Sequence, residues 1–285
     1  YSPRRAVEVR AVSRDDRSRS YEFRHDVSLG GPPAAESAGR TGVSRRVSAV
    51  RVAGEPVFPV GEVERSLDVK VGDRFDFYRW QQDRDHLRRF YLDRGYLEVR
   101  ISARQVPEVG DGTGSRVALE YNVQAGPPTA LDVDGYRLPN RVRRELERIW
   151  SNAVVDVALA DDIRSAVRKH LAEQGFLRAD VRATRIPPVD AAGVKRIRVQ
   201  IEPGSRTSSR ALQVTGNRRL SDADLDAVAL RLGIDVWLVP PVLADEIALL
   251  YKQQGLLAAA VTAGPVTFSD SAAVLPVRIE EGPQF

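Results

Sequence analysis

The sequence predicts an α+β fold in which a β-α-α-β-β unit of about eighty residues repeats in tandem three times. Three landmarks support this prediction, and each returns at a nearly constant spacing. A helix that ends in glycine and passes directly into a strand occurs as FYLDRGYLEVRI, KHLAEQGFLRADV and LYKQQGLLAAAV, with Gly95, Gly175 and Gly255. The other landmarks are strands that end in glycine, at Gly54, Gly135 and Gly216 and at Gly126, Gly204 and Gly282. We expect all nine glycines to lie at structural turns of the repeat.

The first strand and the first helix of each unit show the expected periodicities. The strand alternates, so that one face is apolar: Val50 and Val52, Leu131 and Val133, Leu212 and Val214. In the last unit Ser221 is a predicted helix N-cap with Asp224 three residues later, followed by Leu225, Val228 and Leu232. In the middle unit Val142, Leu146 and Ile149 form the same stripe.

The second helix of each unit carries two apolar residues four positions apart, which lie on one helix face and can cover a sheet. These pairs are Leu87 and Tyr91, Val167 and Leu171, and Ile247 and Tyr251. The glycine that follows suits the left-handed position that ends a helix. Two closing strands complete the unit, at about residues 97–106 and 117–123 in the first one.

The N-terminal part matches the same pattern over half a unit. Residues 1–33 align with the two closing strands and the Gly-Pro-Pro that ends them, so we interpret them as the C-terminal strands of a truncated unit. Residues 34–44 are small and polar, as in a linker. The complete units then span 45–127, 128–205 and 206–285. The alternative is that residues 1–45 form a disordered tail. The chain holds no Met, so we expect it to be a piece of a longer protein.

Composition excludes several classes of function. The chain has no cysteine, which excludes disulfides and thiolate metal sites. Residues 1–50 hold ten Arg against six Asp and Glu, and this excess equals the +4 of the whole chain. A nucleic-acid module would concentrate its excess on the folded part, so we expect no nucleic-acid partner. No apolar run is long enough for a membrane-spanning helix.

No group of residues predicts catalysis or cofactor binding. The three histidines, His25, His86 and His170, never occur four apart or in one loop, which argues against a metal site. Acidic pairs such as Asp161-Asp162 are consecutive and point apart on a helix. No serine lies in a nucleophile elbow with a paired histidine. We therefore expect no enzyme, no cofactor, no metal and no small-molecule substrate.

The repeat resembles the polypeptide-transport-associated (POTRA) domain. The last unit carries the closest match, in VTGNRRLSDADLDAVA, LADEIALLYKQQGLLAAAV and VRIEEGP. The first unit has Gly54-Glu55 where Gly-Asn is usual, and the middle one has Leu171 in place of the helix tyrosine. The resemblance implies that each unit is a three-stranded mixed sheet covered by two helices, and that the units form an elongated array.

The resemblance also implies a function in a Gram-negative bacterium. It indicates the periplasmic part of an outer-membrane protein of the BamA/TamA kind, which assembles or translocates other proteins. The implied partners are unfolded outer-membrane or secreted polypeptides, accessory assembly proteins and a C-terminal membrane β-barrel, absent up to Phe285. Two alternatives stay open: a two-partner secretion transporter with one exported client, and a cell-division type of scaffold. The scaffold would carry one such unit rather than three.

A three-stranded sheet with helices on one face has two edge strands, and the resemblance implies that the strand after the helix-ending glycine is one of them. An unfolded chain can add there as an extra strand. The expected client-binding residues are Leu97, Val99 and Ile101, Leu177, Ala179 and Val181, and Leu257, Ala259 and Val261. Residues 256–261, LLAAAV, are apolar on both faces. They are equally consistent with client binding and with packing against a neighbouring repeat or the barrel.

Overall fold

The structure, a computed structural model, describes residues 45–108, 116–153, 156–186 and 193–283. The predicted half unit at residues 1–33 and the linker at 34–44 lie outside these residues. No helix of the described residues is both long and apolar enough to cross a bilayer.

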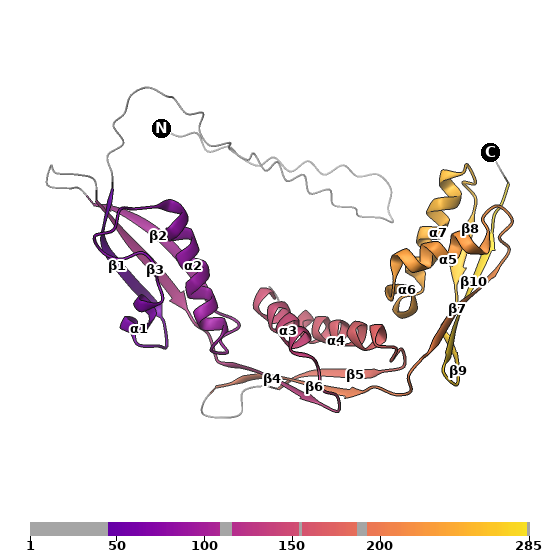
Figure 1. The fold of residues 1–285 in the computed structure, drawn as a ribbon, viewed down its shortest axis with the longest axis horizontal. Helices are drawn as coiled ribbons and strands as arrows, with labels where there is room; N and C mark the ends of the chain where they lie inside the picture. Colours follow the sequence, from indigo (N-terminus) through magenta and orange to yellow (C-terminus); the bar gives the residue numbers. More distant parts are fainter. Residues whose placement is uncertain (1–44, 109–115, 154–155, 187–192, 284–285) are drawn as a thin grey trace, which may run out of the picture. The chain divides into compact units, whose positions relative to one another are not determined.

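Each of the three repeats has the predicted element order (Figure 1). The first repeat consists of β1 (Arg46–Glu55), α1 (Val60–Arg65), α2 (Phe77–Leu92), β2 (Arg100–Glu108) and β3 (Arg116–Gln124). The second consists of β4 (Thr129–Asp134), α3 (Asn140–Asn152), α4 (Asp156–Glu173), β5 (Asp180–Ile186) and β6 (Lys195–Glu202).

The third repeat has the same order with two short additions. It consists of β7 (Ser209–Thr215), α5 (Asp222–Leu232), α6 (Asp235–Leu238), α7 (Pro241–Gln253), β8 (Ala260–Ala263), β9 (Thr267–Ser269) and β10 (Ala272–Glu280). The additions are α6, which lies between the two main helices in sequence, and β9, which pairs with β10 beside the short β8.

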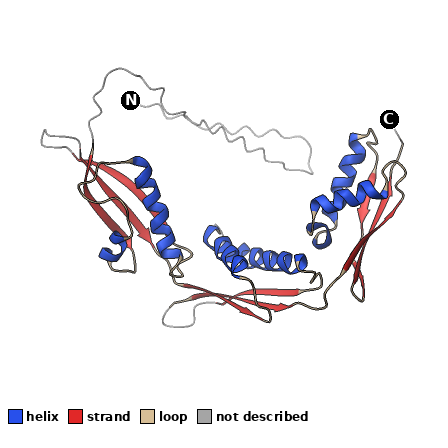
Figure 2. Cartoon of the chain, viewed as in Figure 1, coloured by secondary structure: helices blue, strands red, loops and turns tan. Residues whose placement is uncertain are grey.

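The three sheets share one topology, and the last main strand of each repeat is central. The strand orders are β1-β3-β2, β4-β6-β5 and β7-β10-β8. In each sheet the central strand is parallel to the first strand and antiparallel to the strand after the helices. The helices form the long crossover that a parallel pair requires, and they lie on one face of the sheet (Figure 2). The prediction of mixed sheets of three main strands covered by helices is confirmed, and the third sheet carries the short β9 in addition.

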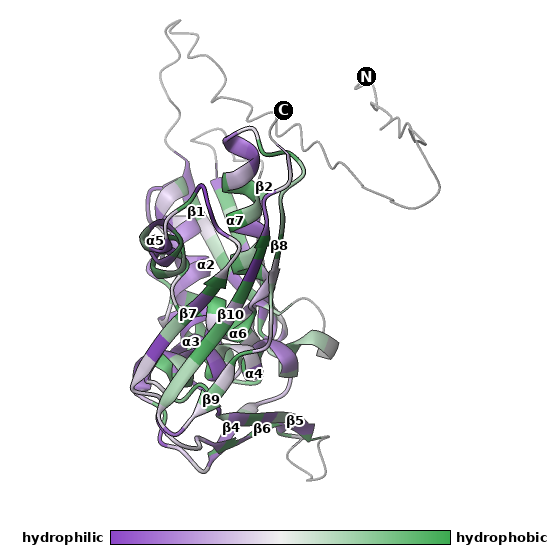
Figure 3. Ribbon diagram, turned by 90° about the vertical axis from the view of Figure 1, so that its right-hand side faces the viewer, coloured by the Kyte–Doolittle hydropathy of each residue, from purple (hydrophilic) through white to green (hydrophobic). Residues whose placement is uncertain are grey.

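A separate apolar core fills each repeat between its sheet and its helices. The predicted helix pairs are all fully buried in these cores: Leu87 and Tyr91, Val167 and Leu171, Ile247 and Tyr251. The apolar residues of the first strands pack against the cores from one face, as their alternation predicts. In the third repeat the central strand β10 is more hydrophobic than its neighbour β7, in keeping with its central place (Figure 3).

The nine predicted turn glycines all have positive φ. At three equivalent positions the backbone also leaves no room for a side chain. A Cβ on Gly54, Gly135 or Gly216 would lie only 2.3, 2.1 or 2.0 Å from a carbonyl oxygen of the central strand. Glycine is therefore required there both by conformation and by the close approach of two strands.

The first repeat has a polar group in its core where the other two repeats are apolar. Asp83 of α2 is fully buried and accepts hydrogen bonds from the backbone N–H groups of Asp68 at 2.6 Å and Val69 at 3.0 Å. The Tyr121 hydroxyl of β3 donates to the same carboxylate at 3.3 Å. Burial, followed by the charge of Asp83, raises the pKa of Tyr121 above its ordinary range. The loop after α1 is thereby fixed to α2 by one carboxylate.

In the third repeat a carboxylate at the end of the chain orders the loop after β7. Glu281 accepts hydrogen bonds from the backbone N–H of Arg218 at 2.6 Å, the N–H of Arg219 at 2.8 Å and the Tyr251 hydroxyl at 3.1 Å. Ser221 and Asp224 form the predicted capping box at the start of α5. Burial of Tyr251, followed by its bond to Glu281, raises the pKa of Tyr251 to about 12.

The Glu281 contacts predict a pH dependence of the third repeat. Burial by itself would raise the pKa of Glu281, but the N–H groups of Arg218 and Arg219 and the Tyr251 hydroxyl outweigh it and lower the pKa. A lowered pKa in the folded state means that the ionised form adds stability above the ordinary value of 4.5, and that this stability is lost as the pH falls through the folded pKa.

We expect Glu281→Gln to be less stable than the natural chain at pH 7, and the difference to shrink toward zero as the pH falls below 4.5. Urea unfolding at a series of pH values measures it. Glu280→Gln is the matched control, because the neighbouring Glu280 is exposed and pairs with the exposed Arg278. A difference that stayed constant down to pH 3 would contradict the assignment.

Candidate functional site

The candidate binding features are the open edge strands and the joints between repeats. The structure places β2, β5 and β8 at sheet edges, each beside one central strand, which confirms the predicted edge position. The strands differ in length: β2 has nine residues, β5 seven and β8 four. In the third repeat Gly264 and Pro265 separate β8 from β9, so the longest edges belong to the first two repeats.

The edge strands begin later than predicted. After the helix-ending glycine a short turn comes first, closed by the Val99 N–H on the Tyr96 carbonyl and by the equivalent pairs at Ala179 and Ala259. Of the nine predicted client-binding residues only Ile101, Val181 and Val261 lie within the strands. Leu97, Val99, Leu177, Ala179 and Ala259 are buried in the turns, whereas Leu257 is exposed.

The sequence predicted that the strand starts earlier, because Leu97 and Val99 alternate with polar residues as strand residues do. The turn is fixed instead by the positive φ of the preceding glycine and the hydrogen bond across it. Alternation in sequence does not distinguish these two arrangements. The available feature of β2 and β5 is therefore their backbone, with the inward side chains held in the cores.

In the first two repeats the leucine two positions after the helix-ending glycine contacts the next repeat. Leu97 belongs to the apolar core of the second repeat. Leu177 forms an apolar cluster with Ala172 of its own repeat and with Ile234 and Ala273 of the third. These two predicted client-binding residues are joint residues, because the turn directs them away from the outer edge.

The glycine itself is part of the same joint. The Gly95 carbonyl accepts hydrogen bonds from the Thr129 N–H at 2.7 Å and the Thr129 hydroxyl at 2.6 Å. The Gly175 carbonyl accepts from the Thr207 N–H at 2.7 Å. Thr129 and Thr207 occupy equivalent positions at the start of the following repeats, so both joints use one contact pattern.

The residue after the joint leucine adds a polar contact. Glu98 accepts hydrogen bonds from the Trp150 indole N–H at 2.9 Å and from the ammonium of Lys195, which is nearly buried, at 2.5 Å. At the second joint Arg178 donates to the Asp270 carbonyl at 2.8 Å and lies over the Phe268 ring. Each joint thus combines an apolar residue with a polar one that faces a matching group.

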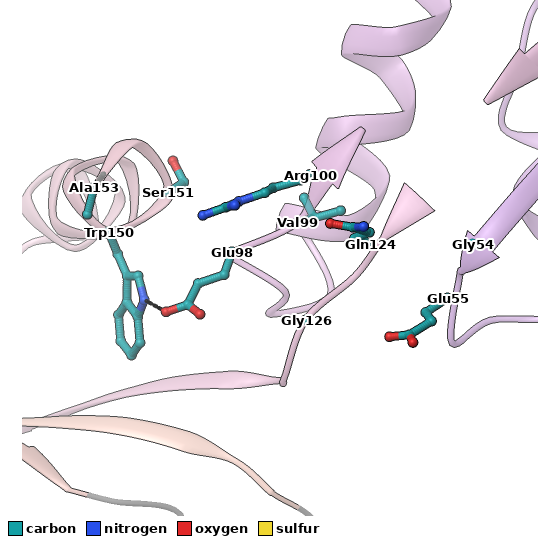
Figure 4. Close-up of a pocket in the computed structure, with 10 residues that line it drawn as sticks. All are labelled: Gly54, Glu55, Glu98, Val99, Arg100, Gln124, Gly126, Trp150, Ser151 and Ala153. Atoms are coloured by element: carbon teal, nitrogen blue, oxygen red, sulfur yellow. Dashed lines mark hydrogen bonds between the residues drawn. The ribbon is translucent and has the colours of Figure 1, made fainter. Parts of the chain in front are cut away.

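A cleft of ≈ 500 Å³ lies at the first joint (Figure 4). It is lined by Gly54, Glu55, Glu98, Val99, Arg100, Gln124, Gly126, Trp150, Ser151 and Ala153. In the close-up the Glu98 carboxylate points to the Trp150 indole, while Arg100, the first residue of β2, extends into the space beside it. The cleft therefore adjoins the start of an open edge strand.

One group of side chains has the composition of a metal site, although the spacing of the histidines in the sequence argued against one. Single ligand atoms of Asp68, Asp83 and His86 lie within 4.8 Å of one another. Both oxygens of Asp83 already accept backbone N–H groups, and His86 Nδ1 pairs with Asp68 at 2.9 Å. These contacts account for the cluster without an ion. His170 is buried elsewhere, in α4.

Comparison with known proteins gives a family match for one repeat. The family model for POTRA, described as a surface antigen variable number repeat, matches residues 45–126. The "Putative outer membrane protein assembly factor" of Treponema pallidum is 22% identical over 194 residues. The match covers 64% of this chain and 23% of that protein, so the chain corresponds to less than a quarter of its relative.

Solved structures of similar proteins include two further arrays. POTRA3-5 of Haemophilus influenzae BamA is 15% identical and covers 86% of this chain and 99% of that one, with a TM-score of 0.34. The N-terminal domain of Omp85 from Thermosynechococcus elongatus is 14% identical and covers 82% and 96%, with a TM-score of 0.28. The two repeats after the matched one share its strand order and its spacing. The first repeat is accordingly a POTRA domain, and the second and third repeats share its fold.

Proposed function

We propose that this chain is the periplasmic protein-binding region of an outer-membrane assembly factor, and that it holds unfolded client chains by β-strand addition to β2 and β5. The observation that carries the proposal is the sheet order, in which each of these strands has one neighbouring strand among the described residues. The similarity to an assembly factor supports the choice of client. Binding clients without altering them fits a family that is not catalytic.

Backbone pairing explains why clients of many different sequences could be bound. An added strand forms hydrogen bonds between main-chain groups, which every client has, and makes few demands on side chains. The outward side chains near the start of β2 are Arg100, Ser102 and Arg104, and those of β5 include Arg182 and Thr184. These polar neighbours keep the edges from pairing with each other when no client is present. The accessory proteins and membrane β-barrel implied by the resemblance are further partners in this proposal.

Strand addition predicts that a ten-residue peptide of alternating apolar and polar residues shifts the amide resonances of Arg100–Glu108 and Asp180–Ile186. The same peptide with three alternate backbone nitrogens methylated should bind at least about tenfold more weakly, because each lost hydrogen bond costs roughly 0.5–1.5 kcal/mol. Nuclear magnetic resonance titration measures both results.

The methylated peptide keeps every side chain, so it is the matched control for binding by side chains alone. Equal affinity of the two peptides, or shifts confined to the exposed faces of α2 and α4, would refute strand addition. For the periplasmic region of an assembly factor, we expect several unrelated peptides to bind this chain with similar affinities. Binding of one sequence alone would favour the two-partner secretion alternative.

A further inference from the structure

The outer face of α3 in the second repeat consists of arginines. Three exposed residues of α3 are three and four positions apart and therefore share one side of the helix. At about 100° per residue this side lies opposite Val142 and Leu146, which are buried in the core. The three residues are Arg141, Arg144 and Arg148, and they are called the arginine face below.

The arginine face has no acidic partner within the described part of the chain. No carboxylate among those residues lies within 4.0 Å of its three guanidinium groups. On the neighbouring helix α4, by contrast, Arg164 pairs with Asp161 at 3.0 Å and Lys169 pairs with Asp235 at 2.7 Å. The acidic residues of α3 itself lie on the two flanks of the arginine face, at Glu145 and Glu147. The face is therefore a narrow positive stripe between two negative flanks.

The arginine face opposes the electrostatics of its own helix. Arg141 lies in the first turn, where the partial positive charge of the helix N-terminus repels a cation. The first turn holds no acidic residue, and Pro139 offers no side-chain cap. Arg144 is three residues from Arg141 and four from Arg148, and like charges at these spacings destabilise a helix. The three arginines thus weaken α3 and form no ion pair within the described residues in return.

The first helices of the other two repeats have the opposite arrangement. In α1 the first turn carries Glu62 and the last turn Arg65. In α5 the first turn carries Asp222 and Asp224, the last turn carries Arg231, and a capping box is present. Only the helix of the second repeat breaks the rule that these two follow. A local arrangement that costs stability is expected where the side chains serve a contact outside the helix.

The chemistry of arginine indicates a carboxylate partner, because the guanidinium group matches a carboxylate with two parallel hydrogen bonds. A membrane or nucleic acid offers a continuous negative surface, which would also meet Glu145 and Glu147. Residues 51–285 hold 33 basic and 33 acidic groups, so the folded part has no general attraction for such a surface. A partner helix with acidic residues three and four positions apart would bring carboxylates to the arginines alone.

We propose that the arginine face of α3 docks the acidic face of a helix of a partner protein, whose carboxylates repeat at the same spacing of three and four residues. The ion pairs formed there offset the repulsion between the arginines of the free chain. The inference is independent of strand addition, since it concerns neither β2 nor β5.

Two alanine-rich helical peptides of identical composition test the proposal. The matched peptide carries three Glu on one face, three and four residues apart, and the control peptide carries three Glu on three different faces. In a nuclear magnetic resonance titration of the full chain at low salt, the matched peptide should shift the amide resonances of Asn140–Asn152. It should bind at least about fivefold more tightly than the control peptide, and the difference should fade as salt is added.

Variants of α3 identify the residues that bind. Arg144→Gln combined with Arg148→Gln should weaken binding of the matched peptide at least about threefold. Arg143→Gln combined with Arg168→Gln removes the same charge from outside the arginine face, and should change the affinity less than about twofold. Arg144→Glu combined with Arg148→Glu should instead bind a peptide in which Lys replaces each Glu.

The Gln variant should melt at an unchanged or higher temperature, because it removes like-charge repulsion; this separates lost binding from lost folding. Equal affinity of the two peptides, or full binding by Arg144→Gln with Arg148→Gln, overturns the proposal. Vesicles with anionic phospholipid are the third probe. If they bind the natural chain and not this variant, while the matched peptide shifts no resonance of α3, the partner is a membrane surface and the proposal is wrong.

Discussion

Gly54→Ala is expected to destabilise the first repeat by about 2–5 kcal/mol, from about 1–2 for a left-handed backbone and about 1–3 for overpacking. The added methyl group would lie 2.3 Å from the Val123 carbonyl oxygen and 2.4 Å from Asn122 Oδ1. The carbonyl belongs to the central strand, so relief would require β1 to separate from β3.

Gly72→Ala is the matched control in the same repeat. Gly72 has a φ of 92°, close to the 90° of Gly54, but a Cβ there would meet nothing within 4 Å. Its replacement should cost only the conformational part, about 1–2 kcal/mol. Urea unfolding followed by Trp80 fluorescence, with Trp150 and Trp237 replaced by Phe, reports on the first repeat. Equal losses for the two variants would show that the close approach is unimportant.

Asp83→Leu is the second change with a large expected effect, a loss of about 2–4 kcal/mol from the first repeat. Leucine has the size and character that Leu243 shows at the equivalent position of the third repeat, so it should fill the space. It would leave the backbone N–H groups of Asp68 and Val69 and the Tyr121 hydroxyl without their acceptor in a buried region. An unsatisfied buried donor costs more than the apolar contact returns.

Asp85→Leu, two residues further along α2, is the control for the removal of a negative charge. Asp85 is exposed and pairs with the exposed Arg84, so its replacement should change the free energy of unfolding by less than about 0.5 kcal/mol. The same fluorescence assay measures both variants. A neutral or stabilising Asp83→Leu would mean that the loop after α1 finds other acceptors and that the carboxylate is dispensable.

The joints explain why the candidate site was only partly predictable. The edge position of the strand after the helix-ending glycine followed from the repeat and its resemblance, and the sheet order confirms it. The assignment of Leu97 and Leu177 to that edge was wrong as a description of their surroundings, because both contact the following repeat. An alternating pattern indicates that a residue is buried, but it does not indicate which part of the chain packs against it.

The polar contacts were even less predictable from the sequence. Glu98, Trp150 and Lys195 meet although they are far apart in the chain, and no motif connects them. Asp83 stands in a helix where the other two repeats have Ile163 and Leu243, which by itself suggests a solvent-facing position. Only the folded chain shows that this carboxylate is buried on two backbone N–H groups.

The sequence by itself determined the repeat, its element order, the helix faces that cover the sheets and the glycines at the turns. These features depend on local periodicity and on backbone conformations that few residue types adopt. Both are determined by residues that are close together in the sequence. The tertiary structure alone decided that Gly54, Gly135 and Gly216 lie against the central strand, and that Leu97 and Leu177 join one repeat to the next. Those contacts join residues that the sequence separates by 63 to 69 positions or that belong to different repeats, and packing rather than propensity selects them.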